Sequence, residues 1–506
     1  MPESIQNSDF QQIRDALQIP REFAPEVLAE AEAAAKRNLL DGNFHDAQDV
    51  PFVTIDPPGS MDLDQAFFAA RKGEGYAVKY AIDDIGFFVD RDSKLEQAAS
   101  ERGVTLYSPD LRTPVYPAIL SESVASLLPD VSRLAIVFDF TLDARAEVKS
   151  CSFTRSIIRS RAKLAYPDVS DHLDAERKIS GSGTMNGHDW SGSLTLLEEI
   201  GRRRQQLEIE RGAINLRIPA QQVERWSTAL YGYRLAFEES SAVEEWNAQI
   251  SLMTGMVAAE MMISHGVGLL RALDPPRHER LLMLSLTAKA LGVRWNDEMD
   301  YADFVRSLDP KNPLHAVVLQ QAAKINGGAR YVAFEGAMPK HAIHAAIAAP
   351  YAHVTAPLRR LADRYVLDLL VDLAEGKEPS EELIERLYKL PQIMSEADHL
   401  SHQLESAIVD FAEARLMQDR IGETFSATVI GLRREGAIVQ ITDPPIRTLL
   451  PVAAFAPDFG GDLQIELSED ASALKIANYQ VSLGQPVSLK LTTVSLSEKN
   501  LSFSLI

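Results

Sequence analysis

The stretch VTIDPPGSMDLDQA, residues 53–66, brings three carboxylates close together in the chain, at Asp56, Asp62 and Asp64. The β-branched run before Asp56 is typical of a strand, and the Pro-Pro-Gly that follows it is typical of a turn. Carboxylates that converge from a strand end and the next turn repel one another unless a cation lies among them. Oxygen ligands without histidine or cysteine favour Mg²⁺, or Mn²⁺, over Zn²⁺, and ions bound in this way activate water for attack at phosphorus.

Two other interpretations of this stretch stay open on spacing alone. Aspartate is common in turns because its side chain bonds to nearby backbone N–H groups. Asp62-Leu63-Asp64 also matches the nucleotide-sugar motif of glycosyltransferases. The pattern therefore predicts a metal site, with a plain turn and a sugar transferase as its alternatives.

Short β-type runs surround this stretch, and helices follow it. Runs rich in β-branched and aromatic residues recur up to residue 148, among them FVTI, YAVKYAI and RLAIVFDFTL, with glycine and proline between them. Helix formers dominate four later segments, 193–212, 242–270, 315–325 and 358–374. This succession predicts an α+β domain over residues 51–375.

The two ends of the chain differ from this centre. Residues 1–50 carry two helical segments, DFQQIRDALQ and APEVLAEAEAAAKRNLL, and predict a short helical extension in which a helix-turn-helix is conceivable. Residues 376–419 are helix-rich and charged, which predicts a connector packed on the main domain. Residues 420–506 contain five strand-length runs, TFSATVIGL, GAIVQITD, RTLLPVAAF, QPVSLKLTTV and NLSFSLI. Five short strands in a segment of this length predict an OB barrel.

The composition excludes several classes of protein. The chain has 506 residues, of which 24% are charged and 46% hydrophobic, so it is neither collagen-like, of low complexity nor mostly disordered. The single cysteine, Cys151, excludes an intramolecular disulfide scaffold and suits a reducing cytosol. The first residues lack the pattern of a secretory signal, and Glu260 and His265 interrupt the most apolar stretch, 250–270, which we predict to be a buried helix. We therefore expect a soluble, cytoplasmic protein without a membrane partner.

The charge balance gives no support to a polyanionic partner. The formal net charge is −21, whereas affinity for nucleic acid comes largely from lysine and arginine. Net charge does not describe a single cleft, however, and basic residues cluster at 155–163, 202–204 and 359–364. Composition alone thus leaves nucleic acid open as a ligand.

Several motifs after residue 66 follow the order of one known family. They are YAIDDI at 80–85, ERGVTLY at 101–107, RAKLAY at 161–166, VEE at 243–245 and YAHVTAPLRR at 351–360. Together with residues 53–66 they resemble the catalytic domain of the ribonuclease II / ribonuclease R family, over roughly residues 50–375. The predicted barrel lies where that family has its RNA-binding OB domain. The resemblance implies a mixed sheet with surrounding helices, and Mg²⁺-dependent, processive 3′→5′ hydrolysis of single-stranded RNA to nucleoside 5′-monophosphates. It further implies a monomer that does not degrade DNA.

Site residues follow from the same resemblance. Asp56, Asp62 and Asp64 would hold Mg²⁺ and orient the attacking water, with Asp62 and Asp64 also counted as catalytic. Arg359 would lie against the scissile phosphate and offset the charge that develops there. These roles are implied by the matched motifs. A purely structural arginine remains the alternative for Arg359.

The expected RNA contacts come from five further positions. Tyr107 would stack on a base near the 3′ end, Tyr166 would contact RNA deeper in the channel, and Arg360 would add a contact beside Arg359. Glu244 would meet the terminal sugar, where a 2′-hydroxyl separates RNA from DNA. Leu216 stands where some relatives have a phenylalanine, so it would give apolar contact without a ring. Tyrosines in a core and a carboxylate in a first helical turn are the structural alternatives.

The sequence also departs from the family pattern. Gln65 replaces a fourth aspartate and is a poorer Mg²⁺ ligand. Asp83, or its neighbour Asp84, is our hypothesis for an acid that restores part of the missing charge. About 50 residues before the catalytic domain are too few for the two cold-shock domains of relatives. In the barrel, Phe425, Phe455 and Tyr479 are candidates for base stacking.

Two rival functions follow from these departures. In the first, Gln65 has disabled the site, and the chain is an RNA-binding or regulatory protein that keeps the channel. In the second, weaker one, the chain is a metal-dependent phosphodiesterase acting on DNA or a nucleotide. The presence of Asp56, Asp62, Asp64 and Arg359 together favours the exoribonuclease.

Overall fold

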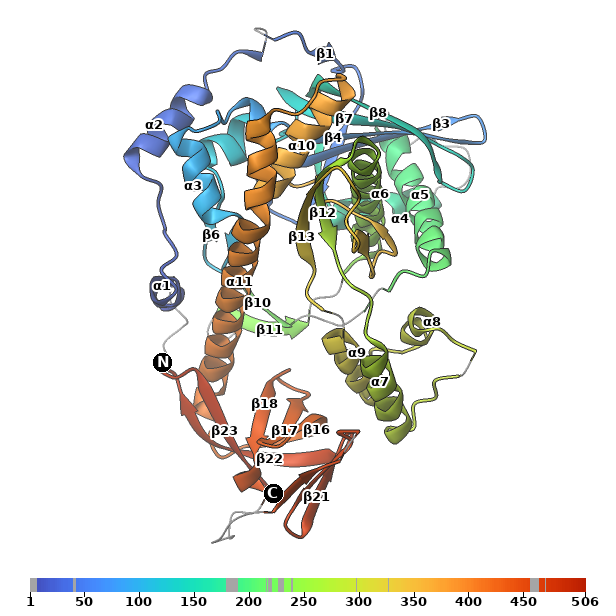
Figure 1. Ribbon diagram of the computed structural model, residues 1–506. Helices are drawn as coiled ribbons and strands as arrows, with labels where there is room; N and C mark the ends of the chain where they lie inside the picture. Colours follow the sequence, from blue (N-terminus) through green and yellow to red (C-terminus); the bar gives the residue numbers. More distant parts are fainter. Residues whose placement is uncertain are drawn as a thin grey trace.

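A computed structural model describes residues 7–39, 42–178, 190–214, 216, 221–225, 232–237, 240–296, 298–325, 327–455, 464–468 and 470–506. Figure 1 shows a body of helices around a large sheet, with the long helix α11 (Glu381–Met417) running from this body to a small β-domain at the carboxy-terminal end. The expected order of an α+β domain, a helical connector and a barrel is therefore the order found.

A seven-stranded mixed sheet forms the centre of the body. Its order is β1-β8-β7-β4-β3-β2-β9. The strands are β1 (His45–Asp46), β2 (Val53–Asp56), β3 (Gln65–Lys72), β4 (Gly75–Asp83), β7 (Ser132–Leu142), β8 (Val148–Arg159) and β9 (Ala162–Ala165). From β2 to β8, each strand of the sheet pairs antiparallel with its neighbour. The two edge strands, β1 and β9, pair in parallel with β8 and β2. The β-type runs predicted from the sequence are confirmed, and the sheet is mixed.

Helices pack on this sheet and carry the rest of the main core. They are α3 (Lys94–Arg102), α4 (Tyr166–Lys178), α5 (Ser191–Glu210), α6 (Ala242–His265) and α10 (Leu361–Ala374). Helices α5 and α6 approach closely because Gly201 has no side chain, and a Cβ atom there would lie 2.4 Å from the Cβ of Trp246. Figure 1 shows α4, α5 and α6 together beside the sheet, and the upper part of α11 beside α10.

The helix predicted over residues 242–270 is shorter than expected. It ends at His265 because Gly266 takes a left-handed conformation with φ of 72°, which is a common helix stop. Val267–Ala272 is then strand β12, paired with β13 (Arg330–Glu335). A continuous apolar run does not by itself separate a buried helix from a buried strand. Among the described residues, no helix combines the length and apolarity needed to cross a bilayer.

The amino-terminal segment contains the two predicted helices, α1 (Asn7–Ala16) and α2 (Pro25–Ala34). It is not entirely helical, however, because β1 lies before residue 51 and extends the central sheet. Smaller elements complete the body: β5 (Leu106–Tyr107), β6 (Arg112–Thr113), β10 (Gln221–Arg225), β11 (Tyr233–Phe237), α7 (His278–Ala290), α8 (Tyr301–Arg306), α9 (Pro313–Ile325), β14 (Ile343–His344) and β15 (Ala349–Pro350).

The carboxy-terminal domain has the five predicted strands in one sheet, in the order β18-β17-β16-β22-β23. They are β16 (Thr424–Arg433), β17 (Gly436–Ile441), β18 (Arg447–Pro451), β22 (Pro486–Ser495) and β23 (Asn500–Leu505). A second sheet of β19 (Ile465–Leu467), β20 (Ala473–Ile476) and β21 (Tyr479–Ser482) was not predicted. Phe425 and Phe455 are buried in the barrel core, which corrects their proposed role as stacking residues, whereas Tyr479 is exposed.

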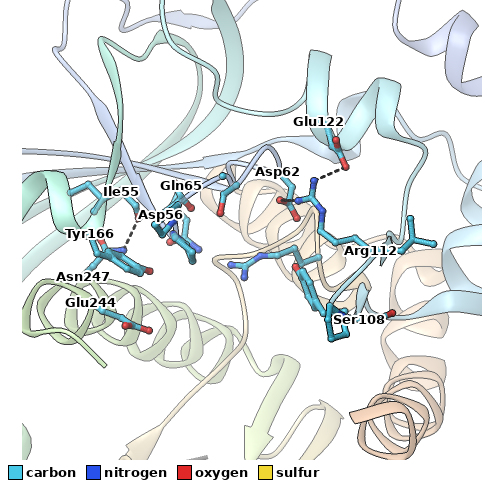
Figure 2. Close-up of a pocket in the computed structure, with 18 of the residues that line it drawn as sticks. Ile55, Asp56, Asp62, Gln65, Ser108, Arg112, Glu122, Tyr166, Glu244 and Asn247 are labelled. Carbon is cyan, nitrogen blue, oxygen red and sulfur yellow. Dashed lines mark hydrogen bonds and ion pairs between the residues drawn. The ribbon is translucent and has the colours of Figure 1, made fainter. Parts of the chain in front are cut away.

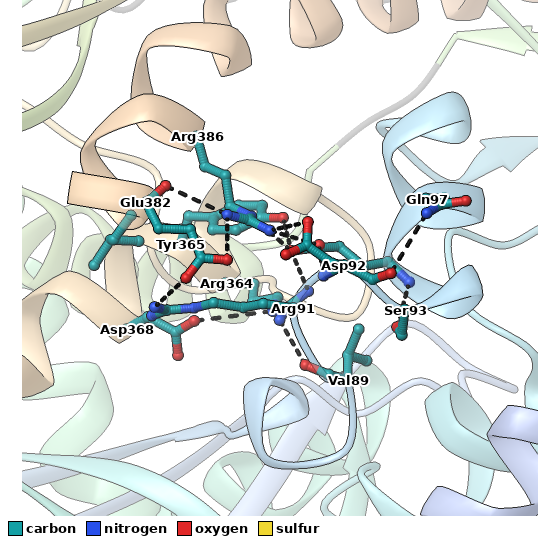
Figure 3. Close-up of polar contacts among 12 residues, drawn as sticks. Val89, Arg91, Asp92, Ser93, Gln97, Arg364, Tyr365, Asp368, Glu382 and Arg386 are labelled. Carbon is teal, nitrogen blue, oxygen red and sulfur yellow. Dashed lines mark hydrogen bonds and ion pairs between the residues drawn. The ribbon is translucent and has the colours of Figure 1, made fainter. Parts of the chain in front are cut away.

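A buried ion-pair network joins α3, α10 and α11. The carboxylate of Glu96 on α3 accepts hydrogen bonds from Tyr365 Oη (2.5 Å), Arg386 Nε (3.0 Å) and the Asp92 backbone N–H (2.6 Å). Burial favours the protonated acid, yet the hydrogen bonds from Arg386 and Tyr365 hold the pKa of Glu96 below its ordinary value. Figure 3 shows Arg386, Tyr365 and Arg364 gathered in this network, which fixes three helices relative to one another.

Replacing Glu96 with glutamine is expected to lower the free energy of unfolding by about 1–3 kcal/mol, because it removes the buried charge to which Arg386 and Tyr365 are hydrogen-bonded. Glu382→Gln is the matched control. Glu382 also pairs with Arg386, at 2.9 Å, but it is exposed to solvent, so about 0–1 kcal/mol is expected. Urea denaturation near neutral pH measures both, and equal effects of the two variants would contradict the interpretation.

Candidate active site

Two of the three aspartates of the opening stretch, Asp56 and Asp62, line a cavity of about 1040 Å³. The third, Asp64, is buried behind the cavity wall and bonds to Arg359, which does line the cavity. Its walls come from the end of β2 and the following turn, the β5–β6 hairpin, the starts of α4 and α6, and the segment before α10. Figure 2 shows Tyr166, Asn247 and Glu244 on the left near Asp56 and Gln65, and Asp62 on the right beside Arg112, Glu122 and Ser108. Residues more than 300 positions apart in the chain thus meet in one space.

Asp56 stands at the last position of β2, where the Pro-Pro-Gly turn begins. Its Oδ2 atom is buried and has no hydrogen-bond partner among the described residues. Burial, with the nearby charge of Asp64, raises the pKa of Asp56 to about 7. A buried carboxylate oxygen without a partner is costly unless a proton or a cation satisfies it. Asp56 is therefore the cavity group best suited to receive a cation.

Asp64 is fully buried and holds Arg359 at the cavity. Its Oδ1 accepts from the Leu358 backbone N–H at 2.8 Å, and its Oδ2 accepts from Arg359 Nε at 2.6 Å. Burial raises the pKa of Asp64 to about 6, against the opposing effect of Arg359. The same pairing raises the pKa of Arg359, so its guanidinium stays charged. Because Nε faces Asp64, the orientation of the guanidinium in the cavity depends on this carboxylate.

Asp62 is paired with an arginine that sequence reasoning missed. Arg112 Nη1 lies 2.6 Å from Asp62 Oδ1, and Arg112 Nη2 lies 3.0 Å from Glu122 Oε1. Arg112 on β6 is the cross-strand partner of Tyr107 on β5. A hairpin around Ser-Pro-Asp in the sequence was the signal that could have placed Arg112 beside Tyr107.

The donor set fits Mg²⁺ or Mn²⁺ in its chemistry. Asp56, Asp62 and Asp64 offer only hard oxygen atoms, which these ions prefer. Within the described parts of the chain, no three acidic, histidine or cysteine side chains are gathered closely enough to hold a metal ion. Asp62 and Asp64 each face an arginine in this structure, whereas Asp56 keeps an unsatisfied oxygen. Two of the three expected ligands, Asp56 and Asp62, thus line the cavity, whereas Asp64 lies behind its wall, and both Asp62 and Asp64 are ion-paired.

Gln65 has a structural task that an aspartate could not perform. Its amide Nε2 donates to the Thr355 carbonyl, and its Oε1 accepts from Tyr80 Oη at 2.7 Å. A carboxylate has no hydrogen to donate to a carbonyl oxygen. Gln65 thus ties β3 to the segment that carries Arg359, at the cavity wall where the family pattern places a fourth acid.

Three of the residues expected to contact RNA line the cavity. Tyr107 is 47% exposed, and Tyr166 begins α4. Glu244 forms a capping box with Ser241 at the start of α6, and it also lines the cavity. The structural role that was the alternative to RNA contact is therefore present as well. Burial and the charges of Glu244 and Asp56 raise the pKa of Tyr166 to about 12. Asn247, also missed from the sequence, donates from Nδ2 to the Ile55 carbonyl at 3.2 Å and joins α6 to β2.

Leu216 and Arg360, which were also expected to contact RNA, do not line the cavity, and their contacts with RNA remain predictions. Leu216 packs against the apolar cluster of α7, α8 and α9. Arg360 directs Nε and Nη2 to Asp363, at 3.0 and 2.8 Å, at the start of α10. Neither residue is among those that line the cavity.

Asp83 and Asp84, the acids proposed to restore part of the missing charge, do not line the cavity. Asp83 is fully buried, and burial with the charges of Asp64 and Asp84 raises its pKa well above the ordinary value. Asp84 lies 2.5 Å from Arg155 Nε and is neutralised there.

The sequence and the fold both have relatives among known proteins. The family model described as RNB domain matches residues 44–376. Ribonuclease R of Chlamydia muridarum is 24% identical over 519 residues, covering 99% of this chain and 70% of that protein. The structure of Mycoplasma genitalium RNase R in complex with ribose methylated single-stranded RNA matches with a TM-score of 0.86 at 19% identity, over 98% of this chain and 78% of that one. Yeast Ssd1, described as a pseudonuclease, matches with a TM-score of 0.70 at 15% identity, over 93% and 58% of the two chains.

Proposed function

Because the chain belongs to the RNB domain family, we propose that it is a divalent-metal-dependent exoribonuclease. In this proposal it degrades single-stranded RNA in the 3′→5′ direction and releases nucleoside 5′-monophosphates. The observation that carries the proposal is the meeting of Asp56, Asp62 and Arg359 with Tyr107, Tyr166 and Glu244 around one cavity, with Asp64 bonded to Arg359 from behind the cavity wall. An acidic cluster without aromatic and basic neighbours would support only cation binding.

The residues take distinct parts in this reaction. Asp56, Asp62 and Asp64 would hold Mg²⁺ or Mn²⁺, and a bound ion of this kind activates water and neutralises phosphate charge. Arg359, oriented by Asp64, is placed to offset the charge that develops on the scissile phosphate. Hydrolysis at this phosphate then leaves a 5′-phosphate on the released nucleotide and a 3′-hydroxyl on the shortened chain.

Two tyrosines and a glutamate around the cavity would bind the RNA. The exposed ring of Tyr107 offers a stacking surface for a base without sequence preference, and Tyr166 offers a second aromatic contact. Glu244 is an acceptor for a sugar hydroxyl, and a contact with the 2′-hydroxyl would select RNA over DNA.

A direct test uses single-stranded RNA and DNA of equal sequence, labelled at the 5′ end. We expect a ladder that shortens from the 3′ end on RNA with Mg²⁺ or Mn²⁺, no shortening with a chelator, and intact DNA. Cleavage of the DNA would instead indicate a phosphodiesterase of different substrate class, and internal cuts in the RNA would indicate an endonuclease.

The second candidate function is RNA binding without hydrolysis. Gln65 replaces an acid, and both Asp62 and Asp64 are occupied by arginines. In the same labelled-RNA experiment this function predicts retention of RNA on the protein with no shortening at any Mg²⁺ or Mn²⁺ concentration. The two functions thus give opposite outcomes on one gel.

The affinity for Mg²⁺ is expected to fall about tenfold for each pH unit below about 7, because one proton competes with the cation at Asp56. The pKa of Asp56 is raised above its ordinary value, so the acid is protonated below about 7 and ionised above it. Binding of the cation near neutral pH should therefore release a proton.

Calorimetric titration with Mg²⁺ in buffers of different ionisation enthalpy measures this proton release. Asp56→Asn removes the titrating group, and the pH dependence should flatten in that variant. Equal Mg²⁺ affinity of the unchanged protein across the acidic and neutral range would contradict the prediction.

A further inference from the structure

We propose that Arg14, on helix α1, is a positioning residue that holds the β5–β6 hairpin in the geometry required for RNA binding by Tyr107. The inference rests on the proposed function for the identity of the ligand. It gives the amino-terminal helix a part in the site, although α1 supplies no residue to the cavity wall.

Arg14 makes a buried, two-pronged ion pair with the turn of this hairpin. Its Nη1 lies 2.7 Å from Asp110 Oδ1, and its Nη2 donates to Asp110 Oδ2 at 2.8 Å. Nη1 also donates to Ser108 Oγ at 2.9 Å. The side chains of Arg14 and Asp110 are each 3% exposed. Paired hydrogen bonds of this kind fix orientation as well as distance.

The turn held by Arg14 belongs to the cavity. Ser108 and Asp110 line it, and the Ser108 backbone N–H donates to the Leu111 carbonyl at 2.9 Å to close the turn. Tyr107 precedes the turn and Arg112 follows it, as directly opposed residues of β5 and β6. A displacement of the turn would therefore move both the stacking surface and the partner of Asp62.

Helix α1 packs against the body of the protein, and this packing fixes the position of Arg14. Phe10, one helical turn before Arg14, is fully buried and packs edge-on against Tyr233 (5.3 Å between ring centroids) and Phe411 (6.2 Å). Phe411 lies on α11. The chain of contacts runs from α11 through Phe10 and Arg14 to Asp110 and the hairpin.

The ion pair between Arg14 and Asp110 is better explained by orientation of the turn than by stability. A buried ion pair is weak evidence for stability, because apolar residues of similar size often serve as well or better. A bidentate pair does, however, specify one orientation of the turn relative to α1. At its base the hairpin has its own tie, from the Thr105 backbone N–H to the Arg359 carbonyl at 2.9 Å. Arg14 holds the other end of the hairpin, the turn between β5 and β6.

The test compares Arg14→Met with the unchanged protein in binding of single-stranded RNA, in chelator so that no cleavage occurs. We expect about tenfold weaker affinity, which is within the loss expected for a displaced base-stacking residue. In a Tyr107→Ala background the same change should weaken binding by less than about twofold, because effects that act through one residue are not additive. An undiminished effect in that background would overturn the proposal, as would unchanged affinity in the single variant.

Arg37→Met is the matched control. Arg37 also joins the amino-terminal segment to the body, through Asp90 and the Phe87 carbonyl (2.5 Å), but it does not line the cavity. Its RNA affinity should equal that of the unchanged protein. Asp110→Asn removes the same ion pair with a smaller change of shape and replaces Arg14→Met if that variant does not fold. Arg14→Lys, which keeps one charged donor, should recover part of the affinity.

Hydrogen exchange without RNA separates this proposal from the proposed function. Amides of residues 104–113 should exchange faster in Arg14→Met and Asp110→Asn than in Arg37→Met. If the unchanged protein binds no RNA, the proposed function fails, while faster exchange still supports positioning by Arg14. Equal exchange in all variants would overturn the positioning role.

Discussion

Replacing Asp64 with asparagine is expected to reduce the rate of RNA hydrolysis by about 10²–10³-fold, with little change in RNA affinity. Asp64 accepts from Arg359 Nε and from the Leu358 backbone N–H, and it is one of the three proposed cation ligands. Asparagine has the shape of aspartate but no charge, and it presents either an N–H group or a weaker acceptor to the guanidinium of Arg359. Tyr107 and Tyr166, which would bind the RNA, are left unchanged.

Single-turnover cleavage of labelled RNA and equilibrium binding in chelator measure the two quantities separately. Asp139→Asn is the matched control, since this carboxylate also pairs with a cation, but that cation, Lys79, does not line the cavity as Arg359 does. Its activity should equal that of the unchanged protein. Hydrolysis by Asp64→Asn at more than a tenth of the normal rate would contradict the role of Asp64.

Removal of Arg359 is expected to have an effect of similar size on kcat, about 10²–10³-fold for Arg359→Ala, because a positioned positive charge acts most strongly in the transition state. Arg359→Lys should recover little of this rate. A lysine ammonium is a point charge, whereas the guanidinium can face Asp64 with Nε and still present other N–H groups to a phosphate. A change confined to KM would indicate that Arg359 serves only in binding.

The same variant should lose stability as pH rises. In Arg359→Ala the buried Asp64 loses its charge partner, so its pKa rises further above that of the unfolded chain. A group with a raised folded-state pKa contributes stability at low pH that is lost as pH rises through that value. Urea denaturation at acidic and at alkaline pH should therefore show a larger deficit at alkaline pH. In the double variant with Asp64→Asn, part of this deficit should disappear.

Local pattern was sufficient for most elements of the fold. The β-branched run before Asp56, the two amino-terminal helices and the five barrel strands were all predicted, because their signals lie within a few consecutive residues. The prediction of one helix over residues 242–270 was wrong, because a helix and a strand are both apolar when they are buried on all sides. Only Gly266 marks the boundary between helix α6 and strand β12. The sheet β19–β21 was missed because its strands are short and polar on one face.

The sequence by itself determined the chemistry of this protein: oxygen ligands at the end of a strand, an arginine, two tyrosines and the family to which their order belongs. Only the tertiary structure decided which partner each group meets. Asp64 faces Arg359, Asp62 faces Arg112, and Arg14 reaches the turn beside Tyr107. The physical reason is that hydrogen bonds and ion pairs act over a few ångströms, whereas these partners are separated by about 50 to 300 positions in the chain. Where a buried charge finds its counter-ion therefore depends on packing between distant segments, and local sequence carries little information about it.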